Sequence, residues 1–394
     1  MQGCSLQAEP EQKIISAPEQ TISPEPKSEP ETQKATFPPK ETTPPAESVL
    51  ESVLESVSES ISESKPESEL SEILYSALSQ YQETVQIQQK IDPNELEQAV
   101  NIIERTHPEI FWISGYSMRY NSQSAEISFQ IINQYSSDQL RQMADELERT
   151  VQEILKTIDP ALSDVEKIRK IHDNLVLSTE YDFISAQSSR KDISNSAYGC
   201  LVSHKAICQG YAQAFQLLLN RLGMECGICS GIARNQPHAW NYVLLNQKYY
   251  WIDVTWDDPV KNAGDPSESA FPEDWISHDY FLLDDATLHR TRTFDEDNVF
   301  IPVCDSLEEN EFVRSGNYLE SYSFSEMNQK FTEHVSDGRL EIMFRTEEAY
   351  QACLQDLFTE NHIWDAEIFQ SGGGQIHYQQ DPDLYILRFL FTVH

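Results

Sequence analysis

Apolar side chains at spacings of three and four predict a buried helix that begins at Cys208 and ends before Gly223. Gly223 stands where a helix end favours a residue that tolerates positive φ. The spacing does not continue cleanly before Cys208, so this cysteine is expected at or near the first turn. The free N–H groups and the partial positive charge of that turn favour a thiolate, which makes Cys208 a candidate nucleophile.

The same periodicity, together with β-branched and aromatic runs, predicts an α+β chain in several units. Amphipathic helices are expected over residues 69–81, 92–103, 137–158, 164–177, 325–335 and 347–358. Strands are expected over 111–120, 125–132, 226–233, 238–245, 339–345, 375–378 and 384–393, with a further one beginning at 249. The expected units are an acidic Pro-, Ser- and Glu-rich tether over 1–70, an N-terminal α/β extension over 71–160, a core over 161–302 and a small C-terminal α/β domain over 322–394.

A predicted hairpin supplies the base that a nucleophilic cysteine needs. His238 opens its first strand, and Asp253 lies in its second strand, after a turn at Asn246 and Gln247. In an antiparallel pair the two side chains can be neighbours on one face of the sheet. Asp253 would then hold the imidazole of His238, and the imidazole would deprotonate Cys208, as in a Ser-His-Asp triad with sulfur in place of oxygen.

Three blocks in this order resemble the transglutaminase-like superfamily. They are Cys208-Gln-Gly-Tyr-Ala, His238-Ala-Trp-Asn and Tyr250-Trp-Ile-Asp253-Val-Thr-Trp-Asp-Asp-Pro259, with Gly231 between the first two. Weaker similarity extends upstream to His172-Asp-Asn-Leu-Val and Tyr181-Asp182 and downstream to Thr291-Arg-Thr-Phe294, so that it covers about residues 92–300. The resemblance implies a papain-like core, in which a helix carrying the cysteine packs on an antiparallel sheet carrying the histidine and the aspartate. It also implies that Cys208 is the nucleophile, His238 the base and Asp253 the orienting acid.

Such a triad transfers acyl groups through a thioester, and this chemistry requires no cofactor and no metal ion. Attack by water makes the enzyme a peptidase or amidase, whereas attack by an amine makes it a transglutaminase-like cross-linking enzyme; we favour proteolysis. The expected partner is a peptide or protein substrate. The alternative is a non-catalytic module that binds peptides or proteins on the same fold. A zinc site at Cys226-Gly-Ile-Cys229 is disfavoured, because strand residues three apart face opposite sides.

Four aromatic residues are further candidates around the triad. Tyr198 can offer its hydroxyl to a developing oxyanion, and packing of its ring in the core is the alternative. The backbone N–H of Cys208 is the stronger oxyanion donor, because it lies at a helix start. Trp240, Trp256 and Trp275 are candidates for lining the cleft, with core packing as the alternative.

The balance of charge narrows the range of partners. The chain of 394 residues carries 65 acidic and 28 basic residues, which gives a net charge of -37. Nucleic acids and anionic membrane surfaces attract basic proteins, so neither is expected as a partner. No apolar run reaches the length of a membrane span.

Cys4 is a candidate lipidation site. The pair Gly3-Cys4, followed by an acidic and Pro-rich stretch, resembles the mature start of a bacterial lipoprotein. The charged and apolar parts of a signal peptide are not in the sequence. This interpretation predicts a lipid tether to the membrane and a location at the cell surface. The alternative is an ordinary cysteine in a cytoplasmic protein.

Overall fold

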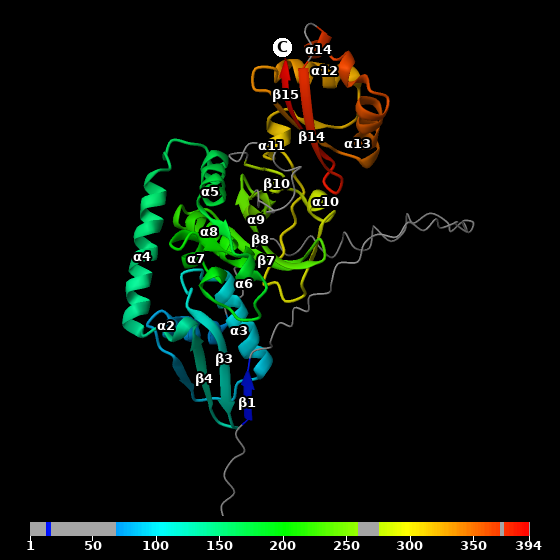
Figure 1. The fold of residues 1–394 in the computed structure, drawn as a ribbon. Coiled ribbons are helices and arrows are strands. Elements are labelled where there is room, and N and C mark those ends of the chain that lie inside the picture. Colours follow the sequence, from blue (N-terminus) through cyan, green and yellow to red (C-terminus); the bar gives the residue numbers. More distant parts are fainter. Residues whose placement is uncertain (1–12, 17–67, 259–275, 371–373, 394) are drawn as a thin grey trace, which may run out of the picture.

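The computed structural model describes residues 13–16, 68–258, 276–370 and 374–393 (Figure 1). Most of the predicted tether, including Cys4, lies outside these ranges, and so does Trp275. Within these ranges the fold is α+β, with helices packed on sheets that are mainly antiparallel. None of the helices in the described ranges combines the length and the apolar composition that a membrane span needs.

The N-terminal part is a four-stranded sheet with three helices. Its elements are β1 (Lys13–Ser16), α2 (Glu69–Leu78), β2 (Thr84–Ile87), α3 (Pro93–Thr106), β3 (Ile113–Tyr120), β4 (Ala125–Ile131) and α4 (Ser137–Lys156). The strand order is β1-β3-β4-β2, and each neighbouring pair is antiparallel. Asp92 caps α3, and Ser136 forms a capping box with Gln139 at the start of α4, so both helices begin where their sequence signals predict.

The central part contains the helix that begins at Cys208. Its elements are α5 (Asp164–Ser178), β5 (Glu180–Tyr181), α6 (Phe183–Ala186), α7 (Ala197–Leu201), β6 (Lys205–Ala206), α8 (Cys208–Arg221), β7 (Cys226–Ala233), β8 (Gln236–Leu245), β9 (Lys248–Ile252), α9 (Val254–Asp257), β10 (Phe281–Leu283), α10 (Asp285–Leu288) and β11 (Arg292–Phe294). Five of the strands form an antiparallel sheet in the order β10-β9-β8-β7-β11, and α8 packs on β7 and β8. The predicted arrangement of a cysteine-bearing helix on an antiparallel sheet is therefore present.

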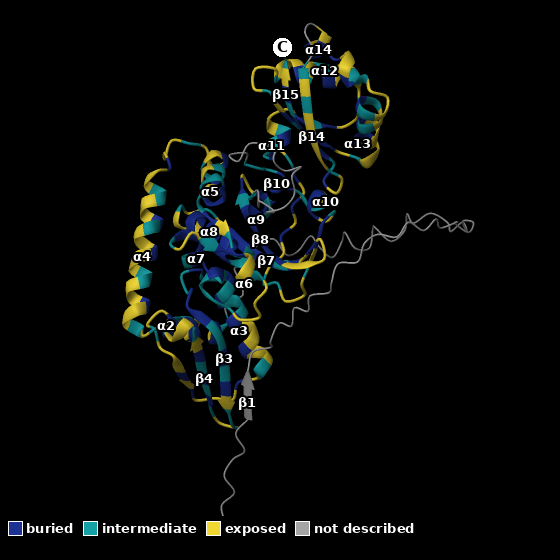
Figure 2. Ribbon diagram, viewed as in Figure 1, coloured by how far each residue is buried: buried dark blue, intermediate teal, exposed yellow. Residues whose placement is uncertain are grey.

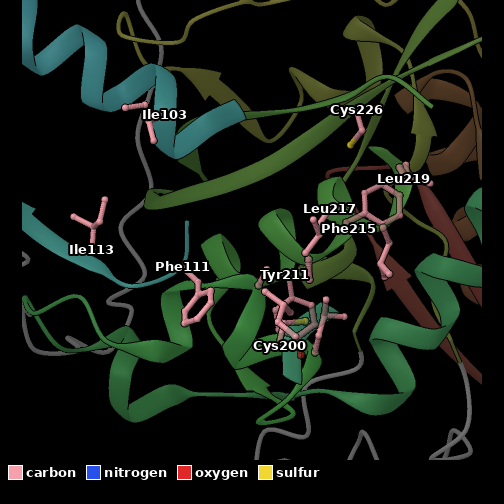
Figure 3. Packing of buried hydrophobic residues seen from close by; sticks show 14 of the residues in the cluster. Ile103, Phe111, Ile113, Cys200, Tyr211, Phe215, Leu217, Leu219 and Cys226 are labelled. Atoms are coloured by element: carbon pink, nitrogen blue, oxygen red, sulfur yellow. The ribbon is translucent and has the colours of Figure 1, made fainter. Parts of the chain in front are cut away.

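One hydrophobic core joins the N-terminal part to the central part. Phe111 and Ile113 of the N-terminal part belong to the same buried cluster as Tyr211, Phe215 and other residues of α8 (Figure 3). Helix α8 is buried on all sides over residues 210–219, whereas α4 exposes much of its length (Figure 2). Because α8 is enclosed by apolar side chains, its first turn is held in a fixed place.

The C-terminal part contains a further four-stranded sheet with its own hydrophobic cluster. Its elements are α11 (Glu311–Arg314), β12 (Tyr318–Leu319), α12 (Phe324–Glu333), β13 (Arg339–Phe344), α13 (Glu347–Leu354), α14 (Glu367–Gln370), β14 (Gly374–Asp381) and β15 (Ile386–Val393). The strand order is β12-β13-β15-β14, with β12 and β13 parallel. This sheet lies at the end of the molecule opposite the N-terminal sheet (Figure 1). Arg388 pairs with Asp279, and Arg234 pairs with Asp381 at 2.7 Å, so charged contacts attach it to the central part.

One predicted strand is shorter in the structure than in the sequence analysis. β9 ends at Ile252, and Asp253 is the N-cap residue of α9. Asn241 is opposite Ile252 in the β8–β9 register, so His238 and Asp253 are not directly opposed cross-strand neighbours. The expectation that Asp253 lies within the strand is therefore wrong, because its side chain accepts the N–H of Trp256 and turns the chain into a helix instead.

Candidate active site

Cys208 is the first residue of α8, as the apolar spacing predicts. Ile207 before it is extended, and Gly210 after it allows the helix start to approach the preceding loop closely. A Cβ atom at Gly210 would lie 2.5 Å from the Ser194 carbonyl oxygen and 2.9 Å from the Ala206 Cβ. The glycine of the Cys-Gln-Gly block is therefore required by packing. Cys208 as a whole is half-buried, in contrast to the buried residues 210–219 that follow it in α8.

His238 lies in β8 and is held from two directions. Its Nε2 atom donates to Asp253 Oδ2 at 2.8 Å. The rings of Trp240 and Trp256 lie beside the imidazole, with centroids 6.1 and 5.7 Å away. Since Nε2 is engaged by Asp253, Nδ1 is the nitrogen left for the sulfur of Cys208, whose negative charge raises the pKa of His238. Imidazole and carboxylate are thus joined by a hydrogen bond, and the imidazole is coupled electrostatically to the sulfur.

Asp253 is 1% exposed and has a partner at each carboxylate oxygen. Oδ1 accepts the backbone N–H of Trp256 at 3.2 Å, and Oδ2 accepts both His238 Nε2 and the guanidinium of Arg292. Burial alone would raise the pKa of this carboxyl group, but the two cations lower it to about 2. Asp253 is consequently an anion at every pH at which the protein is expected to work.

The electrostatics of the other two groups favour an ion pair. Burial would raise the pKa of the Cys208 thiol, but the His238 imidazolium and the N–H of Ala239 lower it below its ordinary value. Burial would lower the pKa of His238, but the negative charges of Asp253 and Cys208 raise it to about 9. A thiolate beside an imidazolium is the state that a nucleophilic cysteine requires.

The remaining cysteines of the described residues that show a shift behave in the opposite way. Burial raises the pKa of Cys200 and of Cys229 to about 12. It also raises the pKa values of Cys304 and Cys353 well above the ordinary range. Cys226 and Cys229 both lie in strand β7, as the sequence predicts. Cys208 is therefore distinguished by its surroundings as well as by its motif.

Arg292 is a residue of the site that sequence reasoning missed. It is the first residue of β11, its side chain is 0% exposed, and its guanidinium binds the carboxylate of Asp253. Its guanidinium lies 3.8 Å from the ring centroid of Tyr280 and 5.0 Å from that of Trp256, close enough for cation–π attraction. The similarity of the stretch 291–294 to the family was the signal that could have found it.

Gly231 explains how β11 approaches closely enough to deliver Arg292. Gly231 in β7 is opposite His238 on one side and Phe294 on the other. A Cβ atom at this position would lie 1.9 Å from the carbonyl oxygen of Thr293. No side chain fits there, so the glycine of the family pattern permits β11 to pair with β7.

Tyr198 does not lie where the oxyanion hypothesis needs it. Its hydroxyl donates to Glu146 of α4 at 2.6 Å, and its ring stacks on Phe111 at 5.1 Å. The alternative, a packed aromatic residue, describes it better, because both contacts face the N-terminal part. Tyr181 is the tyrosine near the sulfur: burial, and then the negative charges of Cys208 and Asp253, raise its pKa well above the ordinary value. It lies in β5, paired with β6 two residues before Cys208.

The three tryptophan candidates have different positions. Trp240 is 1% exposed and belongs to a buried cluster, so it supports the imidazole from the core and does not line an open cleft. Trp256 is partly buried, touches His238 edge-on and is covered by the guanidinium of Arg234 at 5.1 Å. Trp275 lies outside the described residues.

Comparison with known proteins places this site in a recognised class of domain. Residues 149–256, which include all three candidate triad residues, match the family model described as the Transglutaminase-like superfamily. The chain therefore contains a transglutaminase-like domain of α+β architecture.

Individual relatives are distant. Kyphoscoliosis peptidase of Homo sapiens is 26% identical over 111 residues, and that of Mus musculus is 27% identical over 111 residues. Each match covers 25% of this chain and 17% of the relative, so the chain spans a small part of the curated relatives it matches. A solved structure described as a TGase is similar with 17% identity and a TM-score of 0.27, over 48% of this chain and 56% of that one.

Proposed function

We propose that this chain is a cysteine-dependent enzyme that transfers acyl groups from amide bonds of peptides or proteins through a thioester on Cys208. The observation that carries the proposal is the hydrogen bond between His238 and the buried Asp253, together with the electrostatic coupling of the His238 imidazole to the sulfur of Cys208. Cys208 is half-buried, and Asp253 is buried and anionic. A binding module would not need a cysteine whose pKa is lowered in this way.

The groups present can perform each step. The Cys208 thiolate attacks the amide carbonyl carbon, and the developing oxyanion is stabilised by the Cys208 backbone N–H at the start of α8 and by the hydroxyl of Tyr181. The His238 imidazolium protonates the amine as the C–N bond breaks, which leaves a thioester. His238 then removes a proton from water, which attacks the thioester, and the sulfur leaves as thiolate.

We favour water over an amine as the second reactant. The curated relatives are named as peptidases, which supports hydrolysis for this chain. Attack of an amine on the same thioester would give cross-linking, because both reactions share the acyl-enzyme. We propose a peptide or protein as the substrate. The lipid tether at Cys4 and the cell-surface location remain predictions, since Cys4 lies outside the described residues.

Alkylation with iodoacetamide at neutral pH tests the nucleophile. We expect mass spectrometry to show Cys208 alkylated much faster than a small-molecule thiol of ordinary pKa, and His238→Ala to remove this advantage. Cys208→Ser controls for the site of labelling. A Cys208 that reacts no faster than the small thiol would contradict the proposal.

A glutamine-bearing peptide library, incubated with and without an added primary amine, then separates the two outcomes. New peptide termini without amine incorporation indicate hydrolysis, and amine incorporation indicates cross-linking. The absence of both products, and of any Cys208 acyl adduct, would favour the binding module instead.

A further inference from the structure

A second group of histidine and carboxylate side chains lies behind the candidate active site. It consists of His172 and Asp173 of α5, Asp257 of α9 and His278. His172 and Asp257 are both 0% exposed, so neither takes part in surface chemistry. The proposed acyl transfer uses none of these residues, so their arrangement calls for a separate explanation.

Three donor atoms of this group converge on one point. Asp173 Oδ1 lies 2.9 Å from His172 Nδ1 and 2.9 Å from His278 Nε2, and the three atoms all lie within 4.8 Å of one another. A tetrahedral ion with bonds of about 2.0–2.1 Å holds neighbouring ligand atoms about 3.3 Å apart. The two separations that involve Asp173 are each within about half an ångström of this value, so the group is close to a set of metal ligands.

The remaining nitrogen of His172 has the partner that metal-binding histidines usually have. His172 Nε2 lies 3.1 Å from Asp257 Oδ2. Asp257 is itself fixed, because its Oδ1 accepts the N–H of Tyr280 at 2.9 Å and the hydroxyl of Ser277 at 3.3 Å. A carboxylate behind a histidine fixes the ring orientation and directs the other nitrogen toward the metal.

We propose that His172 Nδ1, Asp173 Oδ1 and His278 Nε2 form a binding site for a divalent transition-metal ion such as Zn²⁺. Two imidazoles and one carboxylate suit Zn²⁺ better than Mg²⁺ or Ca²⁺, which prefer all-oxygen ligands. The side chains of Asp173 and His278 are 27% and 12% exposed, so an ion and its water ligands can enter from that side.

The bound ion has a structural role in this proposal. It connects α5 to the segment at His278, and through Asp257 to the end of α9, whose N-cap is Asp253. The ion therefore fixes the position of α9, whose N-cap residue, Asp253, orients His238. The site does not depend on the proposed acyl transfer, because none of its ligands belongs to the triad.

The C-terminal part offers a natural comparison. Asp356, Glu360 and His362 are the other group among the described residues whose donor atoms lie this close together. The His362 side chain is 46% exposed, and its Nδ1 contacts Asp356 at 2.7 Å. No buried carboxylate is recorded behind this histidine in the part of the chain that the structure describes, so it serves as the matched control.

Isothermal titration with ZnCl₂ tests the site, using chelator-treated protein that carries Cys208→Ala so that the thiolate cannot bind the ion. We expect about one Zn²⁺ per chain. The affinity should fall at least about tenfold on addition of His278→Ala or Asp173→Asn and stay unchanged on addition of His362→Ala. Substitution with Co²⁺ should give visible absorption bands typical of tetrahedral coordination, which are lost in the same two variants.

Two results would overturn the proposal. One is the absence of Zn²⁺ binding at micromolar concentrations by the folded Cys208→Ala protein. The other is binding that His278→Ala and Asp173→Asn leave intact while circular dichroism shows both variants folded. Asp173 and His278 are partly exposed, so at least one of these variants is expected to keep the fold.

Discussion

His238 and His172 are both buried imidazoles held by aspartates at the two ends of α9, Asp253 and Asp257. In both cases burial lowers the pKa and neighbouring carboxylates raise it, with a net value of about 9. Their remaining neighbours differ. His238 faces the sulfur of Cys208, and its aspartate is shared with Arg292, whereas His172 faces a second carboxylate, Asp173.

This difference shows that a buried histidine–aspartate pair does not define an active site by itself. A raised pKa makes an imidazole a cation at neutral pH, which stabilises either a thiolate or a second carboxylate. Only the thiolate is a nucleophile. The chemical role of each imidazole is therefore set by its third partner.

Cys208→Ala should abolish turnover of the peptide found in the library screen, by a factor on the order of 10⁶, because the covalent step loses its nucleophile. The measurement is the rate of product formation by mass spectrometry. Cys353→Ala, a change in the buried core of the C-terminal part, should leave the rate per folded molecule unchanged. Equal losses in the two variants would show that Cys208 has no special role.

His172→Ala should lower the free energy of unfolding by about 3–5 kcal/mol, because it leaves the carboxylate of Asp257 buried with no cation beside it. His238→Ala should lower it less, since Arg292 still neutralises Asp253. Urea unfolding of chelator-treated protein, followed by tryptophan fluorescence, measures both. His362→Ala, at a partly exposed histidine, is the control. A larger loss of unfolding free energy for His238→Ala than for His172→Ala would contradict the prediction.

Arg292→Gln should reduce turnover by up to about 100-fold, because Asp253 and the imidazole lose a fixed orientation. It should also raise the pKa of His238 further, since the negative charge of Asp253 is less compensated. The alkaline limb of the pH–rate profile, set by loss of the imidazolium proton, should then move to higher pH. Arg292→Lys should restore part of the rate, and Arg345→Gln, at an exposed pair with Glu320, should change neither quantity. An unaltered profile in Arg292→Gln would leave Arg292 with a packing role only.

The smallest expected effect is on the titration of His238 itself. The Cys208 thiolate raises the pKa of His238, so Cys208→Ala should lower it below about 9. A histidine with a raised pKa stabilises the fold fully below its ordinary pKa near 6.5, and this contribution is lost as pH rises through about 9. The pH range over which protonated His238 stabilises the fold should therefore end at a lower pH in Cys208→Ala. NMR titration of the ring protons measures the shift, and the His172 resonances serve as the internal control.

Much of the central part could be predicted from the sequence. Apolar periodicity placed the start of α8 at Cys208, and aromatic and β-branched runs placed the strand that carries His238. These elements are defined by local patterns of burial, which a single sequence reveals. The chain order of cysteine, histidine and aspartate then indicated the chemistry.

What the sequence could not reveal depends on contacts between distant segments. Arg292 meets Asp253 only because β11 pairs with β7 at the edge of the sheet, and the family similarity of the stretch 291–294 does not say which side chain its arginine contacts. The position of the Tyr198 side chain could not be predicted for a similar reason. Its separation from Cys208 in the chain was short, but its contacts with Glu146 and Phe111 turn it toward another part of the core.

The position of Arg292 has a practical consequence for anyone who shortens this protein. The match to the family model stops at residue 256, so a fragment trimmed to that boundary would retain Cys208, His238 and Asp253. It would nevertheless lose the guanidinium that shares the carboxylate of Asp253, together with the strand that carries it. A minimal fragment that keeps the site intact should therefore extend at least through β11, some forty residues beyond the end of the family-model match.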